Sequence, residues 1–224
     1  MGKQMDKKMG RKWLRMYTMT VDSGFAPHVR NGLISLACCA GPTREHANVG
    51  DFVLGLSGKK MYNKKTYNYV PRHTLIYLMK VDEKLKFNEY FYDSRFSNRS
   101  DNIYRKRKRN DKYIQDRRHV KDKRYMSEHK GKDDTRIYKN VLLSRNFYYF
   151  GDRWRSDDKL HKRMEKFCEK VKYVYKPHGQ CEDISSDNGD VKKLLRFIKK
   201  YPLGKNGKPN HLPDNNQKLK CHTH

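Results

Sequence analysis

The sequence predicts an α+β fold built on a compact mixed β-sheet, strongly curved or in the form of an open barrel, with flanking helices. Two observations lead to this class. Short apolar runs rich in β-branched and aromatic residues recur through the first two thirds of the chain, which is typical of strands. Two later segments carry apolar residues at helical spacing. The 224 residues are expected to form a basic flexible N-terminus (1–12), a single domain (13–203) and a disordered tail (204–224).

Strands are predicted where an apolar run is bounded by turn residues. Residues 33–40 combine an apolar run with small side chains, which fits a central strand packed on both faces. Sixteen Tyr and nine Phe add large buried areas, which compensate for a hydrophobic share of only 35%. The predicted strands are residues 13–21, 33–40, 52–56, 74–81, 137–144 and, as a short strand or an aromatic turn, 147–151.

The turn at Gly50-Asp51 opens the strand at 52–56. Gly50 can adopt a positive φ, and Asp51 can accept a bond from its own backbone two residues further on. Gly55 has no side chain, so another backbone or a flat ligand can approach it, and Ser57 ends the strand before a Lys- and Tyr-rich run. This combination indicates the rim of a binding pocket, and the alternative is a tight turn before an ordinary strand.

Two amphipathic helices are predicted in the last third of the chain, with charged residues between their apolar positions. Their apolar faces should pack against the sheet as core. The second helix starts near Asp190 and ends at Pro202. A short helix is also expected within residues 85–92. The two apolar stripes are Leu160, Met164, Phe167, Val171 and Val174, and Val191, Leu194, Leu195, Ile198 and Tyr201.

Four consecutive aromatic residues, 147–150, cannot all face one core. Some pack inward while the others form a platform on which a base stacks, or they plug the end of a barrel. Packing into the core is the more common use of such residues.

The chain carries 52 Lys and Arg against 25 Asp and Glu, a formal net charge of +27. Such an excess indicates a polyanionic partner, and nucleic acid is the commonest one. An anionic membrane surface is less well supported, because the sequence has no long basic amphipathic helix with an aromatic face. The alternative is a basic proteome or a salt-adapted surface. No run of eighteen apolar residues predicts a membrane span.

Residues 104–134 form a basic insertion, predicted to be a mobile loop or ribbon because it has almost no apolar periodicity. Its densest part is Arg105, Lys106, Arg107, Lys108 and Arg109, which we expect to contact a phosphate backbone. A solvated charge run that binds nothing is the alternative.

Common catalytic motifs are absent from the sequence. It contains no Walker loop, no GxGxxG after a strand, no GxSxG, no HExxH and no deaminase zinc signature. The five Cys are read as reduced thiols of a cytoplasmic protein, because their number is odd and most lie far apart. Cys221 and the neighbouring His residues lack a preorganised geometry, so no metal site and no cofactor is predicted.

Recognition of a nucleobase requires aromatic partners for its faces and an Asp or Asn for its edge. The predicted ligand-binding residues are Asp22, Phe25, Gly55, Ser57, Asn102 and Tyr148, and Tyr62 is a further stacking candidate. The catalytic residue is left open among Asp22, Cys38 and Asn102. Cys38 would act as a nucleophile if it faced a pocket near His28 or His46, although a small buried Cys is more often plain core.

Several stretches, in this order, resemble the second family of nucleotide modification associated domains over roughly residues 15–155. The matching stretches are Tyr17 to Pro27, Ala37-Cys38-Cys39, Val49-Gly50-Asp51 with Gly55 and Ser57-Gly58, Ser100 to Tyr104, Val141 to Ser144 and Phe147 to Gly151. The Gly50-Asp51 turn is also similar to that of PUA and EVE-like domains that bind modified bases. The sequence departs from the family pattern at His28-Val29 and in the basic insertion.

The resemblance implies an α+β domain of phages and bacteria, linked to systems that install or recognise modified bases. The leading hypothesis is a protein that binds nucleic acid, DNA in preference to RNA, and holds a modified or flipped base or a nucleotide in a pocket beside Gly50-Asp51, in a modification or phage-defence system. A transferase or hydrolase acting on a base or nucleotide is the first alternative. A basic structural protein without a pocket is the second. The oligomeric state is left open.

Overall fold

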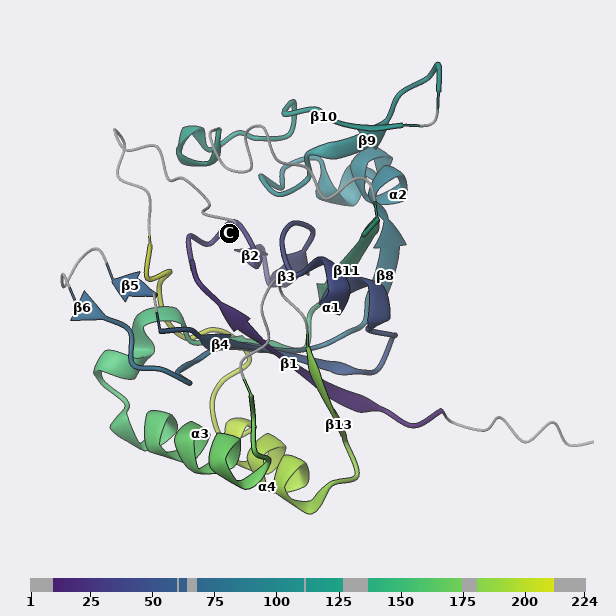
Figure 1. Ribbon diagram of the computed structural model, residues 1–224. Helices are drawn as coiled ribbons and strands as arrows, with labels where there is room; N and C mark the ends of the chain where they lie inside the picture. The colour runs from purple at the N-terminus through teal and green to yellow at the C-terminus, as the bar shows by residue number, and fades with distance from the viewer. Residues whose placement is uncertain are drawn as a thin grey trace, which may run out of the picture.

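The computed structural model describes residues 10–59, 61–63, 68–110, 112–126, 137–174 and 181–211. Its elements are stacked in layers (Figure 1). Helices α3 (Asp158–Lys170) and α4 (Gly189–Ile198) cover one face of a six-stranded sheet, and a four-stranded sheet packs on the other. Helix α2 (Phe87–Tyr92) and the hairpin of β9 (Tyr104–Lys106) and β10 (Tyr113–Gln115) lie at the opposite end from α3 and α4.

Both larger sheets combine strands that are distant in sequence. The six-stranded sheet is mixed, because β1 runs parallel to β4, β12 runs parallel to β14, and the other neighbours are antiparallel. The four-stranded sheet is antiparallel. In spatial order the first contains β13 (Glu182–Ser185), β1 (Trp13–Met19), β4 (Phe52–Ser57), β7 (Leu75–Lys80), β12 (Phe147–Tyr149) and β14 (Gly204–Lys205), and the second β2 (His28–Arg30), β3 (Leu33–Leu36), β11 (Asn140–Ser144) and β8 (Glu83–Lys86).

Short elements complete the fold. The strand predicted over residues 33–40 is shorter than expected, because β3 ends at Leu36 and helix α1 (Gly41–His46) begins after the irregular residues 37–40. A two-stranded ribbon consists of β5 (Tyr62–Asn63) and β6 (Asn68–Tyr69). The 3-10 turns are η1 (Ser94–Phe96), η2 (Lys123–Tyr125) and η3 (Gly151–Arg155). None of the helices in the described part of the chain combines the length and the apolar character that crossing a bilayer requires.

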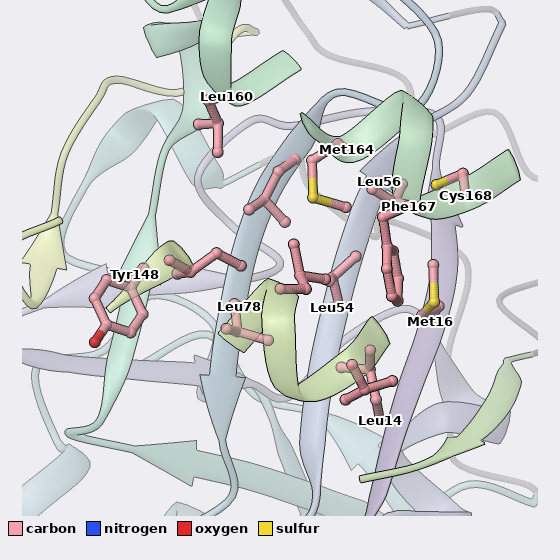
Figure 2. Close-up of a cluster of buried hydrophobic side chains, with 14 of the residues drawn as sticks. Leu14, Met16, Leu54, Leu56, Leu78, Tyr148, Leu160, Met164, Phe167 and Cys168 are labelled. Carbon is pink, nitrogen blue, oxygen red and sulfur yellow. The ribbon is translucent and has the colours of Figure 1, made fainter. Parts of the chain in front are cut away.

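Three hydrophobic clusters fill the spaces between the layers. The first lies between α3, α4 and the six-stranded sheet, where Met164 and Phe167 of α3 meet Leu54 of β4 and Met16 of β1 (Figure 2). Predicted stripe residues Leu160, Val191, Leu194 and Ile198 are buried in the same cluster. The two amphipathic helices predicted from the sequence are therefore confirmed, but the predicted stripe residue Val174 lies beyond the end of α3 and is 65% exposed.

The first and second clusters together take up the run of four aromatic residues. Tyr148 and Phe150 point into the first cluster, whereas Phe147 and Tyr149 point into the second, between the two sheets. Successive side chains of a strand point to opposite faces, so β12 divides its rings between two cores. The third cluster lies between the four-stranded sheet, α2 and the basic insertion. All four rings are core, and none forms the exposed platform considered above.

The α+β class is confirmed, but parts of the predicted organisation differ. No closed barrel forms among the described residues, and the strong curvature stays a prediction. Residues 204–211, expected in the disordered tail, contain β14 and the buried Asn210. Residues 104–110 and 112–126, expected to be a mobile loop or ribbon, contain the two-stranded β9–β10 hairpin and η2. The rest of the predicted tail, residues 127–134 of the insertion and residues 1–9 lie outside the described residues.

Candidate functional site

The Gly50-Asp51 turn has a structural role, because Asp51 connects β1 to the start of β4. Gly50 has a φ of 91°, as its sequence position predicts. The Asp51 carboxylate accepts hydrogen bonds from the backbone N–H groups of Trp13 and Asn48, each at 3.0 Å, and from Arg15 Nε at 3.2 Å. Asp51 therefore ties β1 to the start of β4, and the predicted bond to its own backbone two residues on is not among its contacts.

Protein atoms occupy the space beside Gly55 and Ser57. A Cβ on Gly55 would lie 2.4 Å from the ring of Tyr77, so the close approach that glycine permits is made by this ring. The Ser57 hydroxyl donates to the carbonyl of Pro71 at 2.5 Å and accepts from the N–H of Thr74 at 2.9 Å. These residues fasten β4 to the start of β7.

Asp22 lies just beyond the end of β1 and is fully buried. Its Oδ1 accepts a hydrogen bond from the Tyr149 hydroxyl at 2.5 Å, and its Oδ2 accepts from the backbone N–H and the side-chain Nδ2 of Asn210, each at 3.0 Å. Burial raises the pKa of Asp22, while these bonds act in the opposite direction. The site enclosing Asp22 is thus polar, and the chain around Asn210 already occupies it.

Asn102 and Cys38 lie on the other side of the loop that follows β1. Asn102 Nδ2 donates to the carbonyls of Tyr90 at 3.0 Å and Phe96 at 3.2 Å, while its buried Oδ1 has no hydrogen-bond partner among the described residues. Cys38 is fully buried, with its Sγ 3.6 Å from the carbonyl of Asp101. The structure thus places these two predicted residues close in space but away from solvent.

The predicted stacking residues are distributed over different layers. Phe25 belongs to the third cluster, where its ring packs at 5.6 Å from that of Tyr125. Tyr148 belongs to the first cluster, on the far face of the six-stranded sheet. Tyr62 packs edge-on against Tyr69 in the β5–β6 ribbon. The three rings therefore do not converge on one pocket.

The structure contains a buried ionic network around Arg99 and Asp101 that was not predicted from the sequence. The Arg99 guanidinium donates to Ser35 Oγ at 2.7 Å and to the Tyr90 hydroxyl at 3.0 Å, and its Nε lies 3.7 Å from Asp101 Oδ1. Tyr90 in turn donates to Asp101 at 3.0 Å. In the sequence, Arg99 and Asp101 read as residues of a polar turn. The short distance between Arg99 and Asp101 along the sequence was the only feature of the sequence that indicated an ion pair.

His28 lies next to this ionic network. Its Nδ1 bonds to the carbonyl of Gly24 at 2.9 Å, and because a carbonyl only accepts, Nδ1 carries the proton. Its Nε2 is buried without a hydrogen-bond partner among the described residues. Burial, as the largest cause, lowers the pKa of His28. The ring is thus a neutral base enclosed by the protein.

A basic hollow of about 680 Å³ lies between α2 and the β9–β10 hairpin. We use this name for the space lined by Tyr92, Arg105, Arg107, Lys108, Arg109, Asn110 and Arg118. Four of the five residues predicted to contact a phosphate backbone therefore line one concave surface. The fifth, Lys106, lies in β9 but is not among the lining residues.

The cations of the basic hollow fall into two groups. Arg105 and Arg118 share the carboxylate of Asp116, at 2.6 and 2.7 Å. Their bonds, led by that of Arg118, lower the pKa of Asp116. The exposed residues 107–109 pair with no carboxylate in the part of the chain that the structure describes. These three cations are thus available to an anionic ligand.

Tyr92 adds an exposed aromatic surface to the basic hollow. Its side chain is 58% exposed, although it belongs to α2, whose Phe91 is buried. The two rings meet edge to face at 5.2 Å, and the guanidinium of Arg118 lies 5.4 Å from the Phe91 ring. Sequence analysis did not select Tyr92, because only the placement of α2 shows that Tyr90 and Phe91 are buried whereas Tyr92 is exposed.

The chain was also compared with known proteins. A family model described as nucleotide modification associated domain 2 matches residues 12–216, which include both larger sheets and the basic hollow. No match was found among curated proteins or among solved structures. The looser resemblance to PUA and EVE-like domains stays a prediction. The family resemblance noted in the sequence is confirmed, and the chain belongs to the nucleotide modification associated domain 2 family.

Proposed function

We propose that this protein binds nucleic acid as part of a nucleotide modification system and that the basic hollow is its contact surface. The observation that carries the proposal is the set of exposed cations at 107–109, without carboxylate partners among the described residues, beside the exposed ring of Tyr92. Cations contact phosphates without sequence preference, and the family supplies the link to nucleotide modification.

The combination of charge and an exposed ring favours an unpaired nucleotide over a closed duplex. Proteins that bind single strands place a basic groove along the backbone and aromatic rings against the bases. Arg107, Lys108 and Arg109 would hold phosphates, and Tyr92 would stack on a base that is single-stranded or flipped. The base is thus proposed to enter the basic hollow and not the space beside Gly50 and Gly55, which the side chains of Lys12 and Tyr77 fill.

Binding without a reaction is the function that we propose. The three candidates for catalysis, Asp22, Cys38 and Asn102, are all at most 1% exposed, and each contacts protein atoms. A transferase or hydrolase acting through them would first have to open the fold. Intact nucleosides after incubation with DNA, measured by mass spectrometry, are therefore the expected result.

The test is the binding of a fluorescently labelled DNA single strand, followed by anisotropy over a range of salt concentrations. The test variant combines Arg107→Ser, Lys108→Ser and Arg109→Ser. A matched control removes the same charge from exposed positions on and beside α3 and α4, at the opposite end of the molecule (Figure 1), by Lys159→Ser, Lys166→Ser and Lys200→Ser.

Each phosphate contact on a single strand contributes about 0.7 to the slope of log K against log salt. Loss of three contacts should therefore lower the slope by about 2, whereas the control should keep nearly the wild-type slope. The proposal is wrong if the wild-type protein fails to bind DNA or RNA at low salt, or if both variants weaken binding equally.

A further inference from the structure

The C-terminal segment 206–211 closes over Asp22. Asn210 and His211 are buried, and the backbone N–H of His211 donates to the Asp22 carbonyl at 2.8 Å. In the opposite direction, the backbone N–H of Asp22 donates to His211 Nδ1 at 3.1 Å. Asn210 and His211, whose polarity led us to expect a disordered tail, are thus bound by Asp22, which lies almost 190 positions earlier in the chain.

Both edges of the Asn210 amide are bound by side chains. Its Nδ2 donates to Asp22 Oδ2 at 3.0 Å, and its Oδ1 accepts from Trp154 Nε1 at 3.0 Å. A carboxylate and an indole N–H therefore lie side by side, as one acceptor and one donor. The Tyr149 hydroxyl donates to the other oxygen of Asp22 and fixes the orientation of the carboxylate.

This pair of groups matches the hydrogen-bonding edge of a nucleobase. Every base carries, on adjacent atoms of its Watson–Crick edge, an N–H donor and an oxygen or nitrogen acceptor. The Asn side-chain amide has the same planar pattern of donor and acceptor. Enzymes and readers that take up a flipped base bind this edge by hydrogen bonds in an enclosed pocket.

Segment 206–211 packs closely against the rest of the fold, because glycines lie both in the segment and in the residues that it contacts. A Cβ on Gly207 would lie 1.8 Å from the carbonyl oxygen of Phe150, and a Cβ on Gly151 would lie 2.1 Å from that of Lys208. A Cβ on Gly24 would lie 2.7 Å from the Pro209 side chain. Any added methyl group in these places would move the segment away from Asp22.

We propose that Asp22 and Trp154 form a binding site for the hydrogen-bonding edge of a nucleobase, and that Asn210 occupies this site as an internal mimic. The inference goes beyond the proposed function, because it adds a second base-binding site to the basic hollow, and it rests on that function for the nature of the ligand. A tethered segment competes with a free ligand at an effective concentration of the order of millimolar. A base therefore binds here only when the segment 206–211 is displaced.

The experiment measures the binding of uncharged nucleosides to the full chain by isothermal titration calorimetry. Cytidine, adenosine, guanosine and uridine serve as probes, because they carry the base edge but no phosphate for the basic hollow. Gly207→Ala displaces the segment sterically without changing Asp22 or Trp154. Its matched control is Gly189→Ala at the start of α4, where a Cβ meets no atom within 4 Å.

Gly207→Ala should bind at least one nucleoside at least tenfold more tightly than the wild type, and Gly189→Ala should bind like the wild type. Adding Trp154→Phe to Gly207→Ala should reverse the gain, because the side chain stays aromatic but becomes smaller and loses the indole N–H donor. Trp13→Phe at the start of β1 is the corresponding control and should leave the gain unchanged.

Asn210→Ala provides a second route, since it removes the mimic and leaves the backbone bonds of the segment. If Gly207→Ala fails to fold by circular dichroism, Asn210→Ala decides the question. The inference is overturned if a folded variant of either kind binds no nucleoside, or binds one regardless of Trp154→Phe. Failure of the proposed function is seen separately, because it concerns the salt dependence of oligonucleotide binding at 107–109.

Discussion

The ion pair of Arg99 with Asp101 makes a strong prediction about stability. The two side chains are 5% and 0% exposed, and among the described residues the Asp101 carboxylate otherwise accepts hydrogen bonds only from the neutral hydroxyls of Ser35 and Tyr90. Arg99→Met removes the positive charge and leaves a buried carboxylate without compensation. Breaking a buried pair in this way costs about 3–5 kcal/mol of the free energy of unfolding.

A second change distinguishes charge from packing. If the cost of Arg99→Met comes from the stranded carboxylate, then adding Asp101→Asn removes the charge and should restore about 1–3 kcal/mol. Arg95→Met is the matched control, because Arg95 is 56% exposed in its pairs with Asp93 and Glu83. Exposed pairs of this kind contribute at most about 1 kcal/mol.

Urea unfolding followed by circular dichroism measures all four proteins without adding salt. The reasoning would be refuted if Arg99→Met cost no more than Arg95→Met. It would also be refuted if Asp101→Asn lowered the stability of Arg99→Met further. That second result would show that the network acts through the shape of its hydrogen bonds and not through charge compensation.

Three further changes test the basic hollow and the buried His. Tyr92→Ala should weaken single-strand binding by about 1–3 kcal/mol in an anisotropy titration and leave the salt slope unchanged, because stacking involves no counterion release. Asp116→Asn should strengthen binding at low salt, since it releases Arg105 and Arg118 toward the ligand. The lowered pKa of His28 means that the unfolded chain takes up the proton first, so stability should fall as the pH falls below 6.5. His28→Gln should flatten this part of the profile in urea titrations.

Sequence patterns predicted most strands and both amphipathic helices, because these depend on local periodicity, but they did not predict that the strands form two packed sheets. The α3 stripe with Met164 and Phe167 and the split of rings in 147–150 both follow from the geometry of a single element. The segment 204–211 was assigned to the tail because it is polar. It is ordered by backbone pairing with β12 and by bonds to Asp22, and neither leaves a periodic signal.

The candidate site was predictable only where one stretch contains most of it. The cations of 105–109 are consecutive, so their role as a basic surface could be inferred from charge. Asp22 was selected as a residue able to bind a base edge, but its present partners, Asn210 and Tyr149, are far away in sequence. Similarly, the stretch from Gly50 to Gly55 was taken as a pocket rim, whereas Lys12 lies against Gly50 and Tyr77 against Gly55.

The basic insertion physically connects the two sites that we propose. Its hairpin lines the basic hollow, and its later part places Tyr125 against the loop that follows Asp22, with the Tyr125 hydroxyl donating to the Ser23 carbonyl at 3.3 Å. A Cβ on Gly24 would lie 3.1 Å from that hydroxyl and 2.7 Å from Pro209, so the insertion and the C-terminal segment meet on the same glycine. A nucleic-acid strand bound by the β9–β10 hairpin would therefore contact the basic insertion, and the basic insertion also packs beside the Asp22 site. The same arrangement explains why a segment so rich in charge is ordered, since Tyr125 and Val120 anchor it in the third cluster.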